Sequence, residues 1–145
     1  MKIIEPNTST EFKIYYNLRY EVLRKPWFQP KGSERDDDDA TSIHRMIIDE
    51  PNGKAVAVGR LQFNSIEEAQ IRYMAVSDDY QGKGYGRKMV KVLEDIAREK
   101  GTRHIILQAR ENALKFYKKN GYKIIEKSYL LFDEIQHWLM EKELS

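Results

Sequence analysis

The chain has no cysteine among its 145 residues. A disulfide scaffold, a zinc–thiolate site and a thiol nucleophile are therefore excluded. An excess of one charge is also missing, because the formal net charge is only +2. Proteins that bind nucleic acid usually carry a stronger basic field, so we expect no nucleic-acid partner.

Long apolar runs are absent as well. No stretch approaches the roughly 20 residues that cross a bilayer, and the opening MKIIEPNTSTEF lacks the apolar core of a signal peptide. Hydrophobic residues make up 41% of the chain and charged residues 33%, which is typical of a soluble globular protein. We expect a single domain over residues 1–145, a cytoplasmic location and no membrane partner.

The first predicted helix has a clear start and a clear end. Thr8–Glu11, TSTE, matches a capping box, in which the two side chains satisfy free backbone N–H groups. Phe12 and Tyr15 follow at helical spacing. The helix should run to about Arg24, because the residue before Pro26 avoids helical angles.

Seven short apolar or alternating runs predict strands, and two more segments have helical spacing. The order strand, helix, three strands, helix, strand, helix, two strands predicts an α/β protein with a mixed sheet and helices on both faces. The expected strands cover residues 2–4, 43–49, 55–63, 69–76, 104–109, 122–127 and 135–144. The second helix follows the glycine turn and ends at Gly101, and the third covers residues 112–120.

A glycine-rich turn, QGKGYG at Gln81–Gly86, joins a predicted strand to a helix. Backbone N–H groups at a helix start attract anions, and Lys83, Arg87 and Lys88 add positive charge. No P-loop string is present, and Arg87 breaks the dinucleotide pattern G-x-G-x-x-G. The residues alone leave two interpretations, a phosphate-binding loop or a plain turn.

The chain contains two informative blocks, YMAVSDDYQGKGYGRKMVKVLEDIAREKG and then IILQARENALKFYKKNGYK. Together they resemble the GNAT superfamily of acyl-CoA-dependent N-acyltransferases, and the clear resemblance spans Ala69 to Tyr122. Gln81, Gly84 and Gly86 occupy the named positions of the pyrophosphate motif Q/R-x-x-G-x-G/A. The two blocks in this order and spacing are more specific than the glycine turn alone. The later motif of the family is matched by Asn112, Phe116, Tyr117, Gly121 and Tyr122.

The resemblance implies a three-layer α/β/α fold with a mostly antiparallel central sheet, and acetyl-CoA as co-substrate. The backbone of Gln81–Arg87 would surround the pyrophosphate, and the main chain of Met74–Val76 would pair with the pantetheine amides. Asn112 would lie near the pantetheine arm and Tyr117 near the sulfur. The implied cofactor-binding residues are Met74, Ala75, Val76, Gln81, Gly82, Lys83, Gly84, Tyr85, Gly86, Arg87, Asn112 and Tyr117.

Acetyl transfer to an amine needs groups that handle protons. The resemblance favours Tyr117 as the acid that protonates the departing thiolate, although a helix tyrosine more often packs in a core. A backbone N–H of Val76 is the candidate to stabilise the carbonyl oxygen.

No base is assigned from the sequence. The polar positions of the strand AQIRYMAV hold Gln70 and Arg72, and no carboxylate lies between them and Val76. Glu67 and Glu68 fall just outside the strand, where we expect a solvated turn. His137 is a lone histidine of the last strand, where such a residue is more often structural.

The acceptor site is predicted at the first helix and the segment that follows it, with Arg19, Trp27, Gln70 and Arg72 as candidate substrate residues. Arg19 lies in the apolar stripe of the helix, either reaching solvent at its edge or facing the cleft or a buried carboxylate. Trp27 serves either as a binding platform or as a cover for the core. The run Asp36–Asp39 attracts a cationic amine or, as we prefer, is a solvated charge run. It lacks the spacing of a calcium loop, and no metal site is predicted.

The sequence as a whole predicts an N-acetyltransferase that acts on a primary amine of a small molecule or peptide by direct transfer in a ternary complex. The absence of a Ser-His-Asp constellation favours direct transfer over an acyl-enzyme. The alternative is a noncatalytic domain that binds or senses acyl-CoA, which the missing carboxylate supports. The last two strands are expected to be exposed, and their pairing between two copies would form a homodimer.

Overall fold

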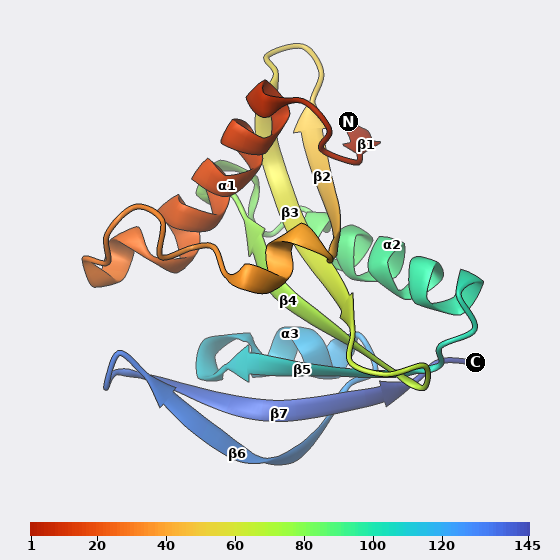
Figure 1. Cartoon of the computed structure of the whole chain (residues 1–145). Helices are drawn as coiled ribbons and strands as arrows, with labels where there is room; N and C mark the ends of the chain where they lie inside the picture. Colours follow the sequence, from red (N-terminus) through yellow and green to blue (C-terminus); the bar gives the residue numbers. More distant parts are fainter.

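A computed structural model describes residues 1–145 and arranges seven strands in one sheet (Figure 1). The strand order is β1-β2-β3-β4-β5-β7-β6, and every neighbouring pair is antiparallel except β4–β5. The predicted mixed, mostly antiparallel sheet is therefore confirmed. The strands are β1 (Lys2–Ile4), β2 (Ile43–Asp49), β3 (Lys54–Phe63), β4 (Glu68–Val76), β5 (His104–Arg110), β6 (Lys123–Leu131) and β7 (Ile135–Glu143).

Helices cover both faces of the sheet, as the sequence predicts. Helix α1 (Ser9–Leu23) packs Tyr15 and Leu18 on one face, against Met46, Val58 and Ala75. Helix α2 (Tyr85–Glu99) and the short α3 (Leu114–Lys119) contribute to the larger core on the other face. The apolar period of each helix faces the sheet because burial of apolar surface is the main stabilising term. No helix is long and apolar enough to cross a membrane.

The capping box at the start of α1 is present as predicted. The Glu11 N–H donates to Thr8 Oγ1 at 3.1 Å, and the Thr8 N–H donates to Glu11 Oε1 at 3.1 Å. Two of the free N–H groups near the helix start are thereby satisfied.

Strands β4 and β5 pair over half their length and then separate. Their register joins Glu68–Ile71 to His104–Leu107, and no pair follows. On the other side of β4 the register with β3 shifts between Val58 and Arg60, opposite Tyr73, whose φ is 51°. Such a bulge bends a strand and often marks a functional site. The edge of β4 beyond Ile71 is therefore left without a neighbouring strand.

The segment between α1 and β2 is more regular than the loop we expected. It holds two 3₁₀ turns, η1 (Lys25–Trp27) and η2 (Asp37–Ala40). Asp36 caps the second turn by accepting a hydrogen bond from the Asp38 N–H at 3.0 Å. The predicted helix over 112–120 likewise divides into a 3₁₀ turn, η4 (Glu111–Ala113), and α3. Glu68 belongs to β4 rather than to the preceding turn.

Candidate functional site

The glycine turn lies between the 3₁₀ turn η3 (Asp78–Tyr80) and α2. Gly82 and Gly84 have φ of 74° and 88°, and a Cβ at either position would meet no atom within 4 Å. Glycine is needed there for its backbone angles, and the space beside it is open. Gly86 is needed for a different reason, because a Cβ would lie 3.1 Å from the ring of Phe116.

A run of backbone N–H groups in this turn is unpaired. None of the N–H groups from Gln81 to Arg87 donates a hydrogen bond within the chain, and the first that does is Lys88, to the Gly84 oxygen at 3.1 Å. Lys83, Arg87 and Lys88 are exposed and form no ion pair. Free N–H groups, a helix start and unpaired cations together make a site for an anion.

The side chain of Gln81 fastens this turn to the strand before it. Its amide nitrogen donates to the Val76 oxygen at 3.3 Å and to Asp78 Oδ1 at 3.1 Å. The turn is therefore held beside the free edge of β4.

A cavity of about 130 Å³ occupies the wedge where β4 and β5 separate; we name it the wedge cavity. Its charged residues are all arginines, Arg24, Arg72 and Arg110. The predicted residues Arg72, Met74 and Tyr117 meet here, although they come from different elements. The lining consists of Leu23, Arg24, Ile71, Arg72, Tyr73, Met74, Leu107, Gln108, Ala109, Arg110, Ala113, Tyr117, Tyr129, Leu131 and His137.

Tyr117 lies on α3 with 8% of its surface exposed. Its hydroxyl contacts the sulfur of Met74 at 3.9 Å, on the β4 edge. Burial raises the pKa of this phenol above its ordinary value of 10.0. Tyr117 therefore stays protonated at neutral pH and is able to act as a proton donor inside the cavity.

His137, on β7, presents an unpaired nitrogen. Its Nδ1 lies 3.0 Å from the Ile135 oxygen, and since a carbonyl only accepts, Nδ1 carries the hydrogen. Nε2 forms no hydrogen bond within the chain and is not sealed from solvent. Burial lowers the pKa of His137, and the charges of Arg110 and Arg24 act in the same direction. The neutral ring is thus a proton acceptor, which the sequence named as a candidate but did not assign.

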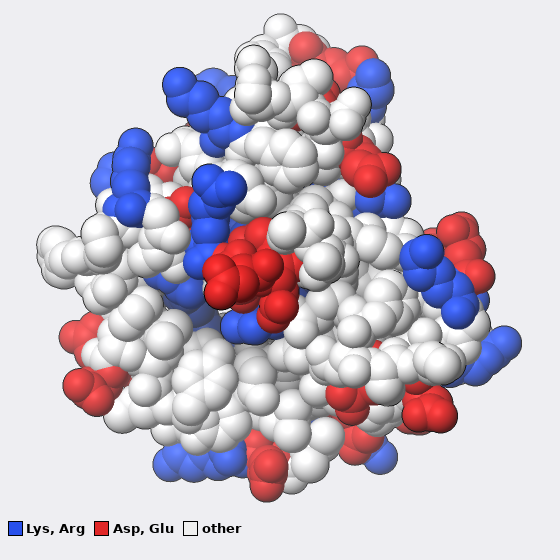
Figure 2. Space-filling model, in the orientation of Figure 1, with Lys and Arg blue, Asp and Glu red and all other residues white.

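The acidic run of residues 36–39 is not simply solvated, which corrects our preference. Asp39 is 9% exposed, and its Oδ1 accepts hydrogen bonds from Arg19 at 2.8 Å and Arg60 at 3.0 Å. Asp36 pairs with Arg60 at 2.6 Å, whereas Asp37 and Asp38 are exposed. Figure 2 shows acidic side chains in the middle of this face with basic ones beside them.

Arg19 does not reach solvent at the edge of the apolar stripe. Its side chain is fully buried, donates to Asp39 and to the Tyr15 hydroxyl, and does not line the wedge cavity. Arg19 therefore supports the segment of residues 36–39 rather than contacting an acceptor.

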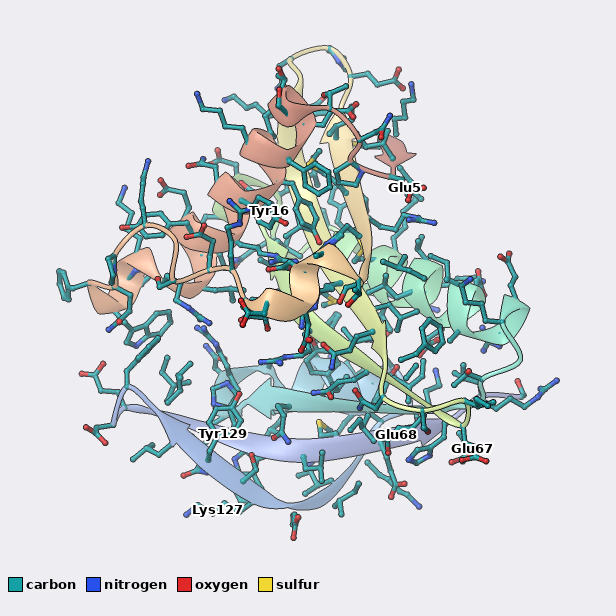
Figure 3. All side chains as sticks on the ribbon, in the orientation of Figure 1. Glu5, Tyr16, Glu67, Glu68, Lys127 and Tyr129 are labelled. Atoms are coloured by element: carbon teal, nitrogen blue, oxygen red, sulfur yellow. The ribbon has the colours of Figure 1, made fainter.

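The other candidate substrate residues are dispersed. Trp27 is half-buried with the Arg110 guanidinium 4.5 Å from its ring centre, while Phe28 is 96% exposed and covers no core. Gln70 accepts a hydrogen bond from Asn64 at 3.0 Å, outside the wedge cavity. Asn112 is exposed in η4, and its side chain forms no hydrogen bond within the chain. In Figure 3, Glu67 and Glu68 lie at the opposite end of the sheet from Tyr129, so neither is placed to act as a base there.

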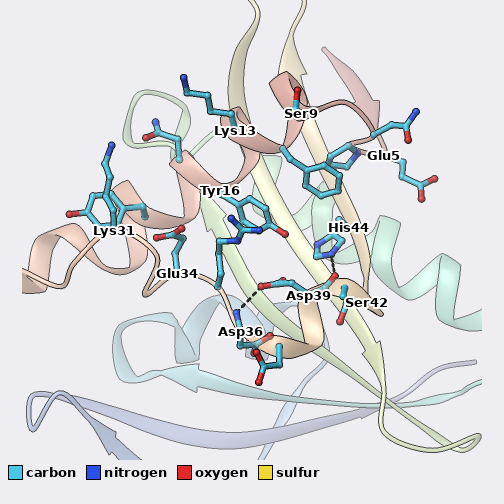
Figure 4. Close-up of a pocket in the computed structure, with 18 residues that line it drawn as sticks. Glu5, Ser9, Lys13, Tyr16, Lys31, Glu34, Asp36, Asp39, Ser42 and His44 are labelled. Atoms are coloured by element: carbon cyan, nitrogen blue, oxygen red, sulfur yellow. Dashed lines mark hydrogen bonds between the residues drawn. The ribbon is translucent and has the colours of Figure 1, made fainter.

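A larger open groove of about 1030 Å³ lies between α1 and the segment before β2 (Figure 4). Lys13 and Tyr16 line it from α1, and Asp36 and Asp39 from the segment. It contains neither the glycine turn nor Tyr117, so it is separate from the wedge cavity.

Residues 12–122 match the sequence model of the Acetyltransferase (GNAT) family. The chain belongs to the GNAT family. The match includes the glycine turn and the α3 motif, so the family expected from the two blocks is confirmed, and membership favours a catalytic over a sensing role.

Several similar proteins match this chain over nearly its whole length. The uncharacterized N-acetyltransferase YjcF of Bacillus subtilis is 28% identical over 99% of this chain and 100% of its own length. A solved structure from Lactobacillus plantarum has a TM-score of 0.86 at 22% identity, covering 99% of this chain and 98% of that one. A GNAT acetyltransferase of Elizabethkingia anophelis, solved with acetyl-CoA bound, has a TM-score of 0.79 at 18% identity, covering 99% and 97%. The similarity to these two solved structures supports the fold assignment.

Two charged residues that line the wedge cavity escaped the sequence analysis. Arg24 ends α1 and Arg110 ends β5, and neither belongs to a local motif. Only the separation of β4 and β5 brings them together with His137, which faces Arg110 in the β5–β7 register.

Proposed function

We propose that this chain transfers an acetyl group from acetyl-CoA to the primary amine of a small molecule or peptide, by direct transfer in a ternary complex. The observation that carries the proposal is the run of unpaired N–H groups at Gln81–Arg87, which adjoins the free edge of β4 and the cavity of Tyr117.

The residues present fit acetyl-CoA. The N–H groups and the open space beside Gly82 and Gly84 suit a pyrophosphate. Ala75 and Val76 pair with β3 on one side, and Met74–Val76 has no strand on the side facing β5, so its free side suits the amides of pantetheine, which would lie along it as an added strand. When bound, acetyl-CoA supplies an acyl group activated as a thioester.

The side chains of the wedge cavity divide the proton transfers between them. The neutral amine nitrogen bonds to the acetyl carbon as the carbon–sulfur bond breaks. His137 Nε2 accepts the proton that the amine loses, and the Tyr117 hydroxyl gives its proton to the thiolate sulfur. His137 then releases its proton to solvent and Tyr117 regains one from solvent, so the products are an amide and a free thiol and both side chains return to their starting states. The Val76 N–H is the candidate donor to the carbonyl oxygen.

Thermal unfolding with and without acetyl-CoA tests the binding half of the proposal. A ligand at ~100 times its dissociation constant should add about 2.7 kcal/mol of stability. Gly84→Glu should abolish that gain, because the side chain fills the open space and repels the phosphates.

Gly53→Glu is the matched control. Gly53 has φ of 69° with no atom within 4 Å of a Cβ, but lies in the turn before β3. Both variants should lose roughly 1–3 kcal/mol through backbone strain, and only Gly84→Glu should lose the response to acetyl-CoA. An unchanged response in Gly84→Glu would refute the placement of the pyrophosphate.

Release of free thiol over a panel of amines tests the catalytic half. Turnover with at least one primary amine is expected. Binding of acetyl-CoA without turnover of any amine would favour the sensing alternative.

A further inference from the structure

The charge of the wedge cavity is entirely positive. Arg24, Arg72 and Arg110 line it, and no aspartate or glutamate does. Arg72 has one distant ion-pair partner, Asp36 at 3.6 Å, whereas Arg24 and Arg110 have none. Arg24 and Arg110 are partly buried, and no acidic side chain compensates the charge of either.

These arginines are nevertheless held in place. Arg24 Nε donates to the Ser33 oxygen at 3.0 Å, and Arg110 Nη2 donates to the Leu23 oxygen at 2.9 Å. The ring of Trp27 supports the Arg110 guanidinium. A guanidinium carries five N–H bonds in a fixed fork, and these contacts use few of them. Rigid donors with free N–H groups remain at the cavity.

A purely structural role explains only part of this arrangement. Basic groups at the end of a helix such as α1 bind its last carbonyls favourably, which accounts for the bonds to Leu23. It does not account for Arg72, nor for the clustering of like charges around one cavity. Burial and the neighbouring charge of Arg24 lower the pKa of Arg110 to about 10, so an anion beside Arg110 would stabilise its charged form.

We propose that the acceptor is a small primary amine that also carries an anionic group, a carboxylate or a phosphonate or phosphate, bound by Arg24, Arg72 and Arg110. This inference rests on the proposed acetyl transfer and names the substrate class for the same site. The guanidinium fork matches such groups in a bidentate manner.

The size of the cavity limits how far apart the amine and the anion are. Tyr117 and the three arginines line one cavity of about 130 Å³. An amine beside Tyr117 and an anionic group on the arginines would share this small space, which favours acceptors with few bonds between the two groups, such as α- and β-amino acids. Polyamines and lysine side chains bring further positive charge and are disfavoured.

Matched pairs of probes test the substrate class. Each α-amino acid is compared with its α-carboxamide, β-alanine with β-alaninamide, and 2-aminoethylphosphonate with ethanolamine. Binding is measured by calorimetry with wild-type protein in the presence of CoA. We expect the anionic member of the preferred pair to have a dissociation constant about 30-fold lower or more, because removing one partner of a buried charge pair typically weakens binding by that factor. The same ranking is expected in kcat/KM from thiol release. Preference for carboxylate over phosphonate, or the reverse, identifies the anion.

In Arg110→Gln and in Arg24→Gln, the dissociation constants of the anionic and the neutral member of each pair should become similar. The dissociation constant of acetyl-CoA should not change. Arg45→Gln, on β2 and outside the cavity, is the control and should keep the wild-type ratio. Thermal unfolding confirms that each variant is folded, and Arg72→Gln replaces any variant that is not.

The outcomes separate the two proposals. Equal binding of anionic and neutral partners, or better turnover of polyamines, overturns the anionic acceptor while leaving acetyl transfer intact. Arginine-dependent binding of anionic amines without thiol release supports the anion site and contradicts the enzymatic activity. If no member of any pair binds, the inference is wrong.

Discussion

Two tyrosines on the same side of the sheet differ in the contacts that their hydroxyl groups make. The rings of Tyr117 and Tyr122 pack edge to face with centres 5.9 Å apart. The Tyr117 hydroxyl contacts Met74 at the wedge cavity, whereas the Tyr122 hydroxyl donates to Glu94 at 2.9 Å in the core. Both match the family motif, but only Tyr117 lines the wedge cavity.

Tyr117→Phe should lower kcat about 10²- to 10⁴-fold, the usual contribution of a proton donor. The dissociation constant of acetyl-CoA should change little, because the ring remains. Steady-state thiol release and calorimetry measure the two quantities.

Tyr122→Phe is the control for that variant. It removes a buried hydrogen bond and should lower the free energy of unfolding by about 1–3 kcal/mol, with kcat close to wild type. Equal rates for Tyr117→Phe and wild type would remove Tyr117 from the mechanism.

At the scale of elements, the turn η2 is fixed by charge. Asp36 and Asp39 are three residues apart, so the 3₁₀ turn places both on its inner side, where the fully buried Arg60 pairs with each. Burial by itself would raise the pKa of Asp39, but Arg19, a backbone hydrogen bond and Arg60 together hold it below its ordinary value. The segment thus closes over the sheet through a network of paired charges.

Asp39→Asn should lower the free energy of unfolding by about 3–5 kcal/mol, because it leaves buried guanidinium groups without a full counter-charge. Urea unfolding measures the change. Asp37→Asn, at an exposed position of the same turn, should change it by less than about 0.5 kcal/mol. Similar losses in the two variants would show that η2 is not held by the ion pairs.

At the scale of the whole molecule, buried titratable groups limit stability on both sides of neutral pH. Burial is the first cause that lowers the pKa of His44 and His137 below 6.5. The unfolded chain then binds more protons below pH 6.5, so stability is lost as the pH falls. Burial raises the pKa of Tyr15 and Tyr117 above 10.0, so stability is lost as the pH rises through and above 10.

We therefore expect the free energy of unfolding to be nearly constant between about pH 7 and pH 10 and to fall on either side. Urea midpoints at pH 4, 5.5, 7, 9 and 10.5, at constant ionic strength, test this dependence. A further fall near pH 4 is expected from Asp36 and Asp39, whose pKa values are lowered in the fold. A maximum below pH 5.5 would contradict the expected dependence.

The exposed apolar residues of β6 bear on assembly. Ile125 and Leu130 are 43% and 51% exposed on this edge strand. Pairing of two copies along β6 stays a prediction, as does the cytoplasmic location.

The sequence by itself determined the family, the order of the elements and the glycine turn at Gln81–Gly86. These follow from spacing within a few residues, since Gly82 and Gly84 need glycine for their own backbone angles and Thr8–Glu11 caps its own helix. Tyr117 was found in the same way, through a motif confined to one turn and one helix.

Only the tertiary structure decided which charges meet. Four similar aspartates gave no local sign that Asp36 and Asp39 pair with Arg60 while Asp37 and Asp38 stay exposed. Arg24, Arg110 and His137 come together because β4 and β5 separate after Ile71 and β7 pairs beside β5. Strand register and separation depend on contacts between distant residues, which no local pattern encodes.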